Sequence, residues 1–355
     1  MLAALLGAGA LMAPAAEAEW TIDGRGFGHG VGMSQYGAYG FALAGRGYRD
    51  ILDHYYTDTK VGKVGGERVR VLLGSGDGSV SFSGAGRACG QDLDPARDYS
   101  FEAGGGGVVL RTSSGDRLRS CGTEGEAAGG VRIGRFGSFR GALVARNSGG
   151  SLMVINALGL EAYVKGVVPN EVPTSWPAEA LRAQAVAARS YGLATERSGV
   201  FDHYADARSQ VYGGRSSEVR STSEAVRATR RQVVEYRGRP AATYFFSTSG
   251  GQTESSEFGF SGGSSVPYLK SVEDPFDDAS PVHTWTERLS DDQMESELDG
   301  LFQGKLRKIE ILERGESPRI VRARVVGSSG STTVTGDTLR ARLGLRSTWA
   351  RFERR

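Results

Sequence analysis

The sequence predicts an α+β fold in which mixed, mostly antiparallel β-sheets pack beside a buried, alanine-rich helix. Residues 66–155 alternate short β-rich runs with Gly/Ser turns, which is typical of an irregular strand-rich region. Residues 152–158 form an apolar run of strand length. The helix predicted over 178–196 carries small or apolar residues nearly all the way round, so we expect it to be buried.

Length and charge narrow the classes of protein to consider. With 355 residues, the chain is long enough for one large domain or two smaller ones. Lys and Arg number 43 and Asp and Glu 41, which gives a net charge of +2, and the arginines are scattered. This distribution argues against a basic stripe for nucleic acid, so no nucleic-acid partner is predicted.

The N-terminal segment, residues 1–19, resembles an export signal peptide. An apolar run over 2–13 precedes Ala16-Glu17-Ala18, which matches the A-x-A cleavage pattern. No positively charged residue stands before the run, and the run is short for a membrane span. An uncleaved anchor is the alternative. With either, we expect the body of the chain outside the cytoplasmic membrane, secreted or associated with the cell wall.

Cys89 and Cys121 are the two cysteines of the chain, and both lie in a polar, glycine-rich stretch. In an exported protein an isolated pair most often forms a disulfide. Closing this loop would stabilise the fold by about 3 to 4 kcal/mol in the chain-entropy model. Two unpaired thiols and a metal site are the alternatives.

Periodicity and turn signals place further elements in order along the chain. Before the β-rich region we expect a strand over 21–23, a glycine loop over 24–32, and helices over 33–44 and 48–56. After the alanine-rich helix we expect a hairpin of strands 232–236 and 241–247, a turn at 247–251, a helix near 291–302, two strands, and a helix over 337–343.

Glu171 is the strongest candidate for chemistry. It stands in the segment Val-Val-Pro-Asn-Glu-Val-Pro-Thr-Ser-Trp-Pro (167–177), which is expected to form a short apolar turn. Apolar neighbours disfavour the ionised carboxylate and raise its pKa toward the range of a general acid. The alternatives are a helix cap or an ion pair. Arg189, on the buried helix, needs a carboxylate, and pairing with Glu171 would lower the Glu171 pKa instead.

Two glycine-containing turns are further candidates for a binding surface. The loop over 24–32 lacks the βαβ unit of a dinucleotide site, so its glycines are expected to bring backbone close to a ligand and to place His29 at a surface. The turn Ser247–Gly251 can aim hydroxyl and N–H groups into a cleft. No histidine stands at metal-binding spacing from another, and His203 lies in a segment that either lines a pocket or is a solvated loop.

Several segments together resemble the stage II sporulation protein D (SpoIID/LytB) family. They are Tyr163–Pro173, Ala180–Tyr191, Ser209–Tyr212, Ser247–Glu254 and Gly26–Ala38. In the sporulation members the glycine–histidine segment follows the core, whereas here it precedes it. The sequence therefore looks like a circular permutation of the usual order, and residues near 20–30 are expected to pack beside residues near 345–352.

The resemblance implies one SpoIID-like domain over residues 20–355. Its expected parts are a glycine–histidine segment (20–60), the β-rich accessory region (66–155), a catalytic core (156–275), and an α/β tail (276–355) that packs back on the N-terminal segment.

The resemblance also implies an activity. The sporulation members are lytic transglycosylases, which cut the MurNAc–GlcNAc bonds of peptidoglycan glycan strands and leave 1,6-anhydro-muramyl ends. The family's acid/base glutamate matches Glu171. The implied substrate-binding residues are Arg189, His29, Gln35, Gln184, Tyr191, Gln210, Tyr212, Ser247, Ser249, Gly250 and Gly251. Some members hold a metal through a histidine and cysteines; His203 stands near that place without a cysteine, so no metal and no cofactor are predicted.

Two other functions are open at this point. LytB-type members are described as enhancing a separate amidase, which implies a non-catalytic module that binds cell wall, with an amidase as partner. The third hypothesis is a hydrolase that uses a second carboxylate, Glu254 or Asp206.

Overall fold

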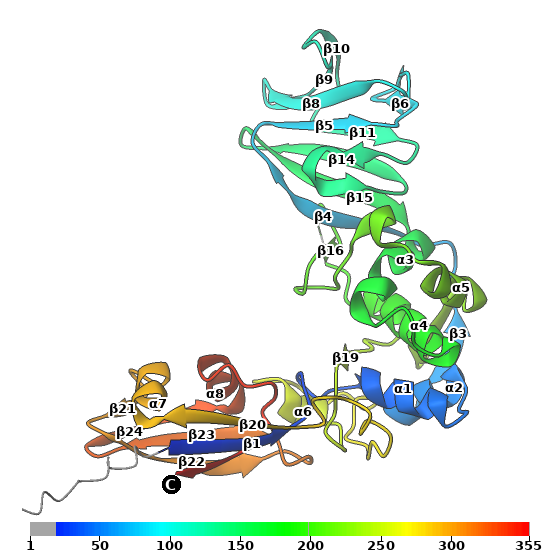
Figure 1. The fold of residues 1–355 in the computed structure, drawn as a ribbon. Coiled ribbons are helices and arrows are strands. Elements are labelled where there is room, and N and C mark those ends of the chain that lie inside the picture. The colour runs from blue at the N-terminus through cyan, green and yellow to red at the C-terminus, as the bar shows by residue number, and fades with distance from the viewer. Residues whose placement is uncertain (1–18, 198, 355) are drawn as a thin grey trace, which may run out of the picture. The chain divides into compact units, whose positions relative to one another are not determined.

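A computed structural model describes residues 19–197 and 199–354 (Figure 1). These residues form two compact units, a larger one of residues 27–283 and a smaller one of residues 19–26 with 284–354. Both combine helices with mostly antiparallel sheets, so the predicted α+β class is confirmed. Within the described ranges, no helix has the length and apolar character needed to cross a membrane. Apart from Glu19, the predicted export signal lies outside the described residues.

The β-rich region of the larger unit consists of two sheets that share one apolar core. One sheet runs in the order β10 (Arg117–Ser120), β9 (Gly107–Thr112), β8 (Asp98–Gly104), β5 (Ser79–Ser83), β12 (Arg132–Ile133) and β13 (Gly137–Ser138). The other runs in the order β16 (His203–Tyr204), β4 (Arg68–Gly76), β15 (Ser151–Gly159), β14 (Ala142–Ser148), β11 (Glu124–Ala128), β6 (Arg87–Ala88) and β7 (Gln91–Asp92).

Alternating side chains hold these sheets together. Phe101 of β8 and Leu110 of β9 face inward and are fully buried, while the residues on either side of each are not. A disulfide joins Cys89 to Cys121, whose Cα atoms are 5.4 Å apart, so the predicted cysteine pair is confirmed.

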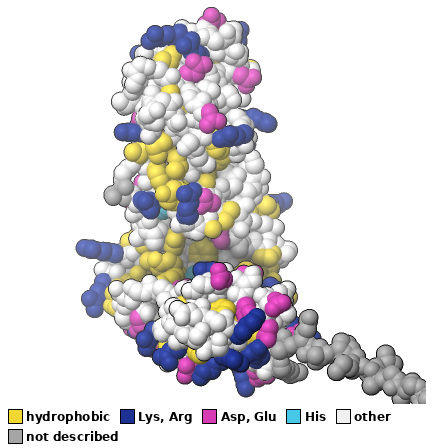
Figure 2. Space-filling view, turned by 90° about the vertical axis from the view of Figure 1, so that its left-hand side faces the viewer, with side chains coloured by type: hydrophobic (Ala, Val, Ile, Leu, Met, Phe, Trp, Pro, Cys, Tyr) yellow, Lys and Arg dark blue, Asp and Glu magenta, His cyan; other side chains and the backbone are white. Residues whose placement is uncertain are grey.

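Helices form the rest of the larger unit. They are α1 (Gln35–Leu43), α2 (Tyr48–Tyr55), α3 (Leu160–Glu171), α4 (Ala178–Ala194), α5 (Arg220–Ala228) and α6 (Ser256–Gly259), with single turns η1 (Gly134–Phe136) and η2 (Gly214–Ser217). The predicted alanine-rich helix is α4, which contacts α1, α2, α3 and α5 and is buried as expected. On the face shown in Figure 2, hydrophobic side chains gather in one area of this unit, with lysine and arginine side chains beside them.

Two small sheets accompany the helices. Strands β18 (Arg239–Pro240), β17 (Gln232–Tyr236) and β3 (Lys60–Lys63) form one, and β19 (Phe245–Phe246) pairs in parallel with β2 (Met33–Ser34) in the other. The strand predicted over 241–247 as the hairpin partner of β17 is therefore wrong. The strand that pairs with β17 is β18, and β19 pairs instead with β2, which follows the glycine loop.

Gly32 explains why the glycine loop can lie against the residues that precede β19. The N–H of Met33 donates to Tyr244 O at 3.1 Å, and a Cβ on Gly32 would lie 2.1 Å from that same oxygen. Gly32 also has a φ of +77°, in the left-handed region that favours glycine. Only glycine lets the two backbones approach this closely.

The smaller unit packs two sheets and two helices around its own core. In one sheet, β1 (Glu19–Arg25) lies between β20 (Thr284–Ser290) and β25 (Ala350–Arg354). The other runs in the order β21 (Phe302–Gln303), β24 (Gly330–Thr335), β23 (Ile320–Gly327) and β22 (Leu306–Arg314), accompanied by α7 (Asp291–Glu297) and α8 (Gly336–Arg342).

The pairing of β1 with β25 joins the two ends of the described chain. It runs from Trp20 opposite Arg354 to Gly24 opposite Ala350. The predicted packing of the N-terminal segment beside the C-terminal one is thus confirmed for β1. The circular permutation itself stays a prediction.

Candidate active site at the end of helix α3

Glu171 is the last residue of a helix and not part of a turn, so the predicted turn is wrong. Helix α3 continues through Pro169 to Glu171. Pro169 lacks an N–H, which is why the sequence signals a break. The helix nevertheless continues, and the side chain of Asn170 adds a hydrogen bond to it, because its Nδ2 donates to Gly166 O in the preceding turn at 2.7 Å. The helix thereby carries the Glu171 carboxyl to a fixed position.

The Glu171 carboxyl is half-buried and receives a hydrogen bond from the chain. The N–H of Val211 donates to Glu171 Oε1 at 3.0 Å. Burial raises the pKa of Glu171 above its ordinary value, and the hydrogen bond from Val211 opposes part of that rise. A raised pKa keeps more of the carboxyl protonated near neutral pH, which suits a general acid.

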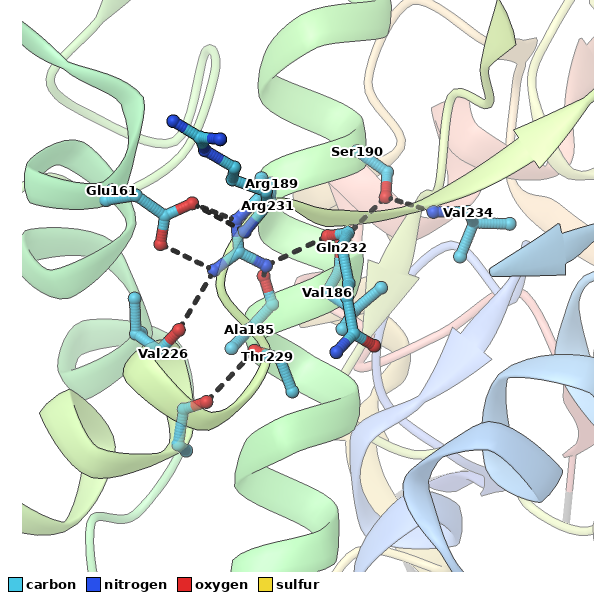
Figure 3. A network of polar contacts seen from close by, with 11 residues as sticks. Glu161, Ala185, Val186, Arg189, Ser190, Val226, Thr229, Arg231, Gln232 and Val234 are labelled. Carbon is cyan, nitrogen blue, oxygen red and sulfur yellow. Dashed lines mark hydrogen bonds and ion pairs between the residues drawn. The ribbon is translucent and has the colours of Figure 1, made fainter. Parts of the chain in front are cut away.

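Arg189 does not pair with Glu171, contrary to the prediction. Its guanidinium, fully buried on α4, makes a bidentate ion pair with Glu161 at the start of α3, with Nε–Oε1 at 2.9 Å and Nη2–Oε2 at 3.1 Å (Figure 3). It also donates to Gln232 O at 3.0 Å and to Val226 O at 3.3 Å. Arg189 thus ties α3, α4, α5 and β17 together, and it does not lower the Glu171 pKa.

Helix α1 brings one of the predicted residues, Gln35, to Glu171. Gln35 Nε2 donates to the backbone oxygen of Glu171 at 3.2 Å. The next residue, Tyr36, donates its N–H to Ser247 O at 3.0 Å. The glycine–histidine segment therefore meets both the Ser247 turn and the end of α3.

An aromatic cluster stands next to this junction, and sequence reasoning missed it as a site feature. The ring centroids of Tyr36 and Tyr39 lie 5.1 and 5.0 Å from that of Trp176. All three side chains are half-buried. The spacing of two tyrosines three residues apart on a glycine-containing helix was the available signal, since residues at that spacing share one helix face.

Gln210 and Tyr191 lie close to Glu171, whereas Tyr212 has a structural role. Gln210 is buried, and its Nε2 donates to Tyr163 Oη and to a backbone oxygen of α4, both at 3.2 Å, which anchors the segment just before Val211. Burial first, and in smaller part the charge of Glu171, raises the pKa of Tyr191. Tyr212 is buried and donates to an asparagine of β15 at 2.8 Å.

His29 belongs to a group of aromatic rings that leads toward Tyr191. Its ring lies 5.1 Å from Phe260 and 6.2 Å from Tyr244, and Tyr244 in turn lies 5.5 Å from Tyr191. The N–H of Val31 donates to His29 Nδ1 at 3.0 Å. These contacts orient the imidazole within the larger unit.

The Ser247–Gly251 turn directs polar groups inward, which differs from the prediction that they point into a cleft. Ser249 Oγ and the N–H of Gly250 donate to buried Asp277 at 2.8 and 2.6 Å. The N–H of Gly251 donates to Ser249 Oγ at 3.0 Å. A carboxylate removed from water needs such donors, and the turn supplies them.

Asp274, the neighbour of Asp277, gives a testable pH dependence. Tyr55 Oη donates to Asp274 Oδ1 at 2.8 Å, and burial, followed by the charge of Asp277, raises the pKa of Asp274 to about 6. Because the folded pKa exceeds the ordinary value of 3.8, stability is lost as pH rises from about 4 through about 6. Asp274→Asn should therefore raise the free energy of unfolding by about 2 to 3 kcal/mol at pH 7.5 and change it little at pH 3.5.

Denaturant unfolding at the two pH values checks this expectation. Asp278→Asn is the matched control, since Asp278 is exposed and the change in charge is the same. A gain from Asp274→Asn that is equal at both pH values would show that the effect is unrelated to titration.

His203 and Gln184 are both buried. The His203 ring stacks on Tyr163 with centroids 5.3 Å apart, and burial lowers the pKa of His203. Gln184 is 1% exposed, and neither atom of its amide has a hydrogen-bond partner. Within the described ranges, no group of three or more His, Cys, Asp or Glu side chains is placed to hold a metal.

The two carboxylates of the hydrolase hypothesis differ from Glu171. Asp206 is exposed, and hydrogen bonds from Arg208 lower the pKa of Asp206 to about 2, which leaves it ionised. Glu254 is fully buried and accepts a hydrogen bond from the N–H of Ser255 at 3.0 Å. Asp206 is therefore unsuited to act as a general acid at neutral pH.

Comparison with known proteins identifies the segment that carries Glu171. Residues 148–236 match the family model SpoIID, described as stage II sporulation protein. This segment is a SpoIID-like core. The resemblance that the motifs indicate is thereby confirmed, and this core holds Glu171, Arg189, Gln184 and Gln210.

Three relatives share parts of the chain. Stage II sporulation protein D of Bacillus subtilis is 30% identical over 213 residues, which are 54% of this chain and 60% of that protein. The amidase enhancer of Bacillus subtilis is 42% identical over 133 residues, 38% of this chain and 18% of that protein. An uncharacterized protein of Brachyspira hyodysenteriae is 40% identical over 152 residues, 42% of this chain and 40% of that protein. The chain thus spans less than two thirds of each.

Proposed function

We propose that this protein acts on the cell wall as an exported peptidoglycan lytic transglycosylase, with Glu171 as its acid and base. The Glu171 carboxyl supports this proposal most. It lies within the SpoIID core, is half-buried at the end of α3, and has a pKa raised by burial. The rings of Tyr36, Tyr39 and Trp176 add apolar faces beside it on which sugar rings could lie.

A single carboxyl group suffices for the chemistry. Protonated Glu171 would donate its proton to the glycosidic oxygen that leaves C1 of N-acetylmuramic acid, as an oxocarbenium-like state develops. The resulting carboxylate would then accept the proton of the C6 hydroxyl of the same sugar, whose oxygen bonds to C1 and closes the 1,6-anhydro ring. The N–H of Val211, 3.0 Å from Oε1, would stabilise the carboxylate between the two steps.

Digestion of denuded glycan strands tests the proposal, with the product ends identified by mass spectrometry. The wild-type protein should release fragments with 1,6-anhydro-muramyl ends, and the Glu171→Gln protein should release them at least about 10²-fold more slowly. Reducing ends would instead show attack by water and would contradict a transglycosylase. The absence of any product from the wild type would also contradict it.

Enhancement of a separate amidase is the second candidate function. It is favoured by the relative named amidase enhancer, which is 42% identical over 133 residues. A protein with this role would bind glycan strands and raise the rate at which a cell-wall amidase releases stem peptides. In that case the Glu171→Gln protein should enhance the amidase as well as the wild type does, while neither protein cuts the glycan.

A further inference from the structure

The smaller unit contains a pocket that the proposed reaction does not use. Its volume is about 580 Å³, within the range of small-molecule binding sites. It opens where β1 ends and where β20 and β25 begin. Tryptophan and arginine side chains dominate its lining, which includes Trp285, Trp349, Arg25, Arg314, Arg351 and Asp23.

The fold holds the two tryptophans in place. The ring of Trp285 lies where a side chain on Gly24 would be, since a Cβ there would meet the ring at 2.1 Å. Trp285 Nε1 donates to Gly26 O at 2.9 Å. The oxygen of Trp349 accepts the N–H of Arg25 at 3.0 Å, and the guanidinium groups of Arg25 and buried Arg319 lie 5.7 and 5.4 Å from the centroid of its ring. Both indoles are therefore set before any ligand arrives, which lowers the entropy cost of binding.

The charges around the pocket favour an anion. The Arg25 guanidinium lies 5.7 Å from the Trp349 ring centroid, and Arg314 Nη2 donates to the backbone of β25 at 3.1 Å. Arg351 is exposed at the rim, where its Nη2 pairs with Glu353 Oε1 at 3.1 Å, an exposed ion pair of the kind that contributes little. The lining contains one carboxylate, Asp23, which already accepts a hydrogen bond from a threonine hydroxyl of β20 at 2.6 Å. Three guanidinium groups against two carboxylates, Asp23 in the lining and Glu353 beside Arg351, still leave the pocket positive.

We propose that this pocket binds a carboxylate-bearing sugar of a wall glycan. A pyranose ring would lie on an indole through its apolar C–H face, and its carboxylate would meet the planar fork of an arginine. A neutral sugar would not need the arginines, and a free anion would not need the indoles. N-acetylmuramic acid without its stem peptide has this combination. The choice of a wall glycan rests on the proposed function, whereas affinity for an acidic sugar does not.

Titration calorimetry on the full wild-type chain tests the proposal with monosaccharides, which offer no bond to cut. N-acetylmuramic acid should bind, and N-acetylglucosamine, which lacks the carboxylate, should bind at least tenfold more weakly. Arg314→Ala and Arg351→Ala should each weaken binding of N-acetylmuramic acid about tenfold (about 1.4 kcal/mol). Arg307→Ala removes the same charge from an exposed position on β22 outside the lining and should change nothing.

Each outcome separates this proposal from the transglycosylase. If both Arg314→Ala and Arg351→Ala bind N-acetylmuramic acid with unchanged affinity, the proposal that this pocket is the binding site is wrong. If Arg314→Ala fails to fold, the affinity of Arg351→Ala alone decides. Glycerol phosphate binding as tightly as N-acetylmuramic acid would overturn the assignment to a carboxylated sugar. Glu171→Gln should bind N-acetylmuramic acid as the wild type does. If these expectations hold while no anhydro product forms, the sugar-binding proposal is supported and the proposed transglycosylase activity is contradicted.

Discussion

Glu171→Gln is expected to lower the rate of glycan cleavage by about 10²- to 10⁴-fold while the fold is retained. Glutamine has nearly the same shape, and its Oε1 can still accept the N–H of Val211 that now donates at 3.0 Å. Its amide cannot deliver a proton to the leaving oxygen. Initial rates on denuded strands measure the effect. Glu126→Gln, which makes the same change at an exposed position on β11, is the control and should leave the rate within about twofold.

The raised pKa of Glu171 also fixes the sign of two pH effects. Wild-type cleavage should fall as pH rises through a value above the ordinary carboxyl pKa of 4.5, because the acid form is then lost. Stability follows the same direction, since a carboxyl whose folded pKa is raised loses stability as pH rises through that pKa. Glu171→Gln should therefore unfold at a higher temperature than the wild type at pH 7 and at a similar one at pH 3.5. Cleavage that persists unchanged in Glu171→Gln would remove Glu171 from the mechanism.

The sequence pattern was sufficient to predict those elements that depend only on residue type and spacing. The alanine-rich helix was expected over 178–196 and spans Ala178–Ala194, because its composition alone requires burial on all sides. The buried strand expected over 152–158 is the centre of β15. The Cys89–Cys121 pair followed from the number of cysteines in an exported chain. None of these depends on which distant segment comes to lie nearby.

Partner choice between distant segments could not be predicted in the same way. A buried Arg189 requires a carboxylate, but the requirement does not distinguish Glu161 from Glu171. Once α3 is known to be a helix, the two are separated by about 15 Å along its axis, and only one can reach the guanidinium. Because Pro169 signalled an early break in α3, the sequence did not indicate that Glu161, and not Glu171, is the partner of Arg189. The donor from Val211 is a backbone group in a loop, which leaves no side-chain signal in the sequence.

Glu161→Ala is expected to lower the free energy of unfolding by about 3 to 5 kcal/mol, because it leaves a buried guanidinium without its counter-charge. Arg189 is fully buried, and the Glu161 carboxylate accepts two hydrogen bonds from its guanidinium. The same carboxylate also accepts the N–H of Arg231 at 3.0 Å. Denaturant unfolding measures the loss. Glu224→Ala removes a carboxylate from an exposed ion pair on α5 and should have little effect.

The double variant Glu161→Ala/Arg189→Met decides whether the loss comes from the unpaired charge. Methionine fills part of the same volume without a charge, so the double variant should be more stable than Glu161→Ala alone, and the two single losses should not add. Additive losses would mean that Glu161 and Arg189 act separately. Glu161 lies in the first turn of the helix that Glu171 ends. If the pair fixes α3 against α4, glycan cleavage by Glu161→Ala should fall under conditions where the protein is still folded, and the double variant should recover part of it.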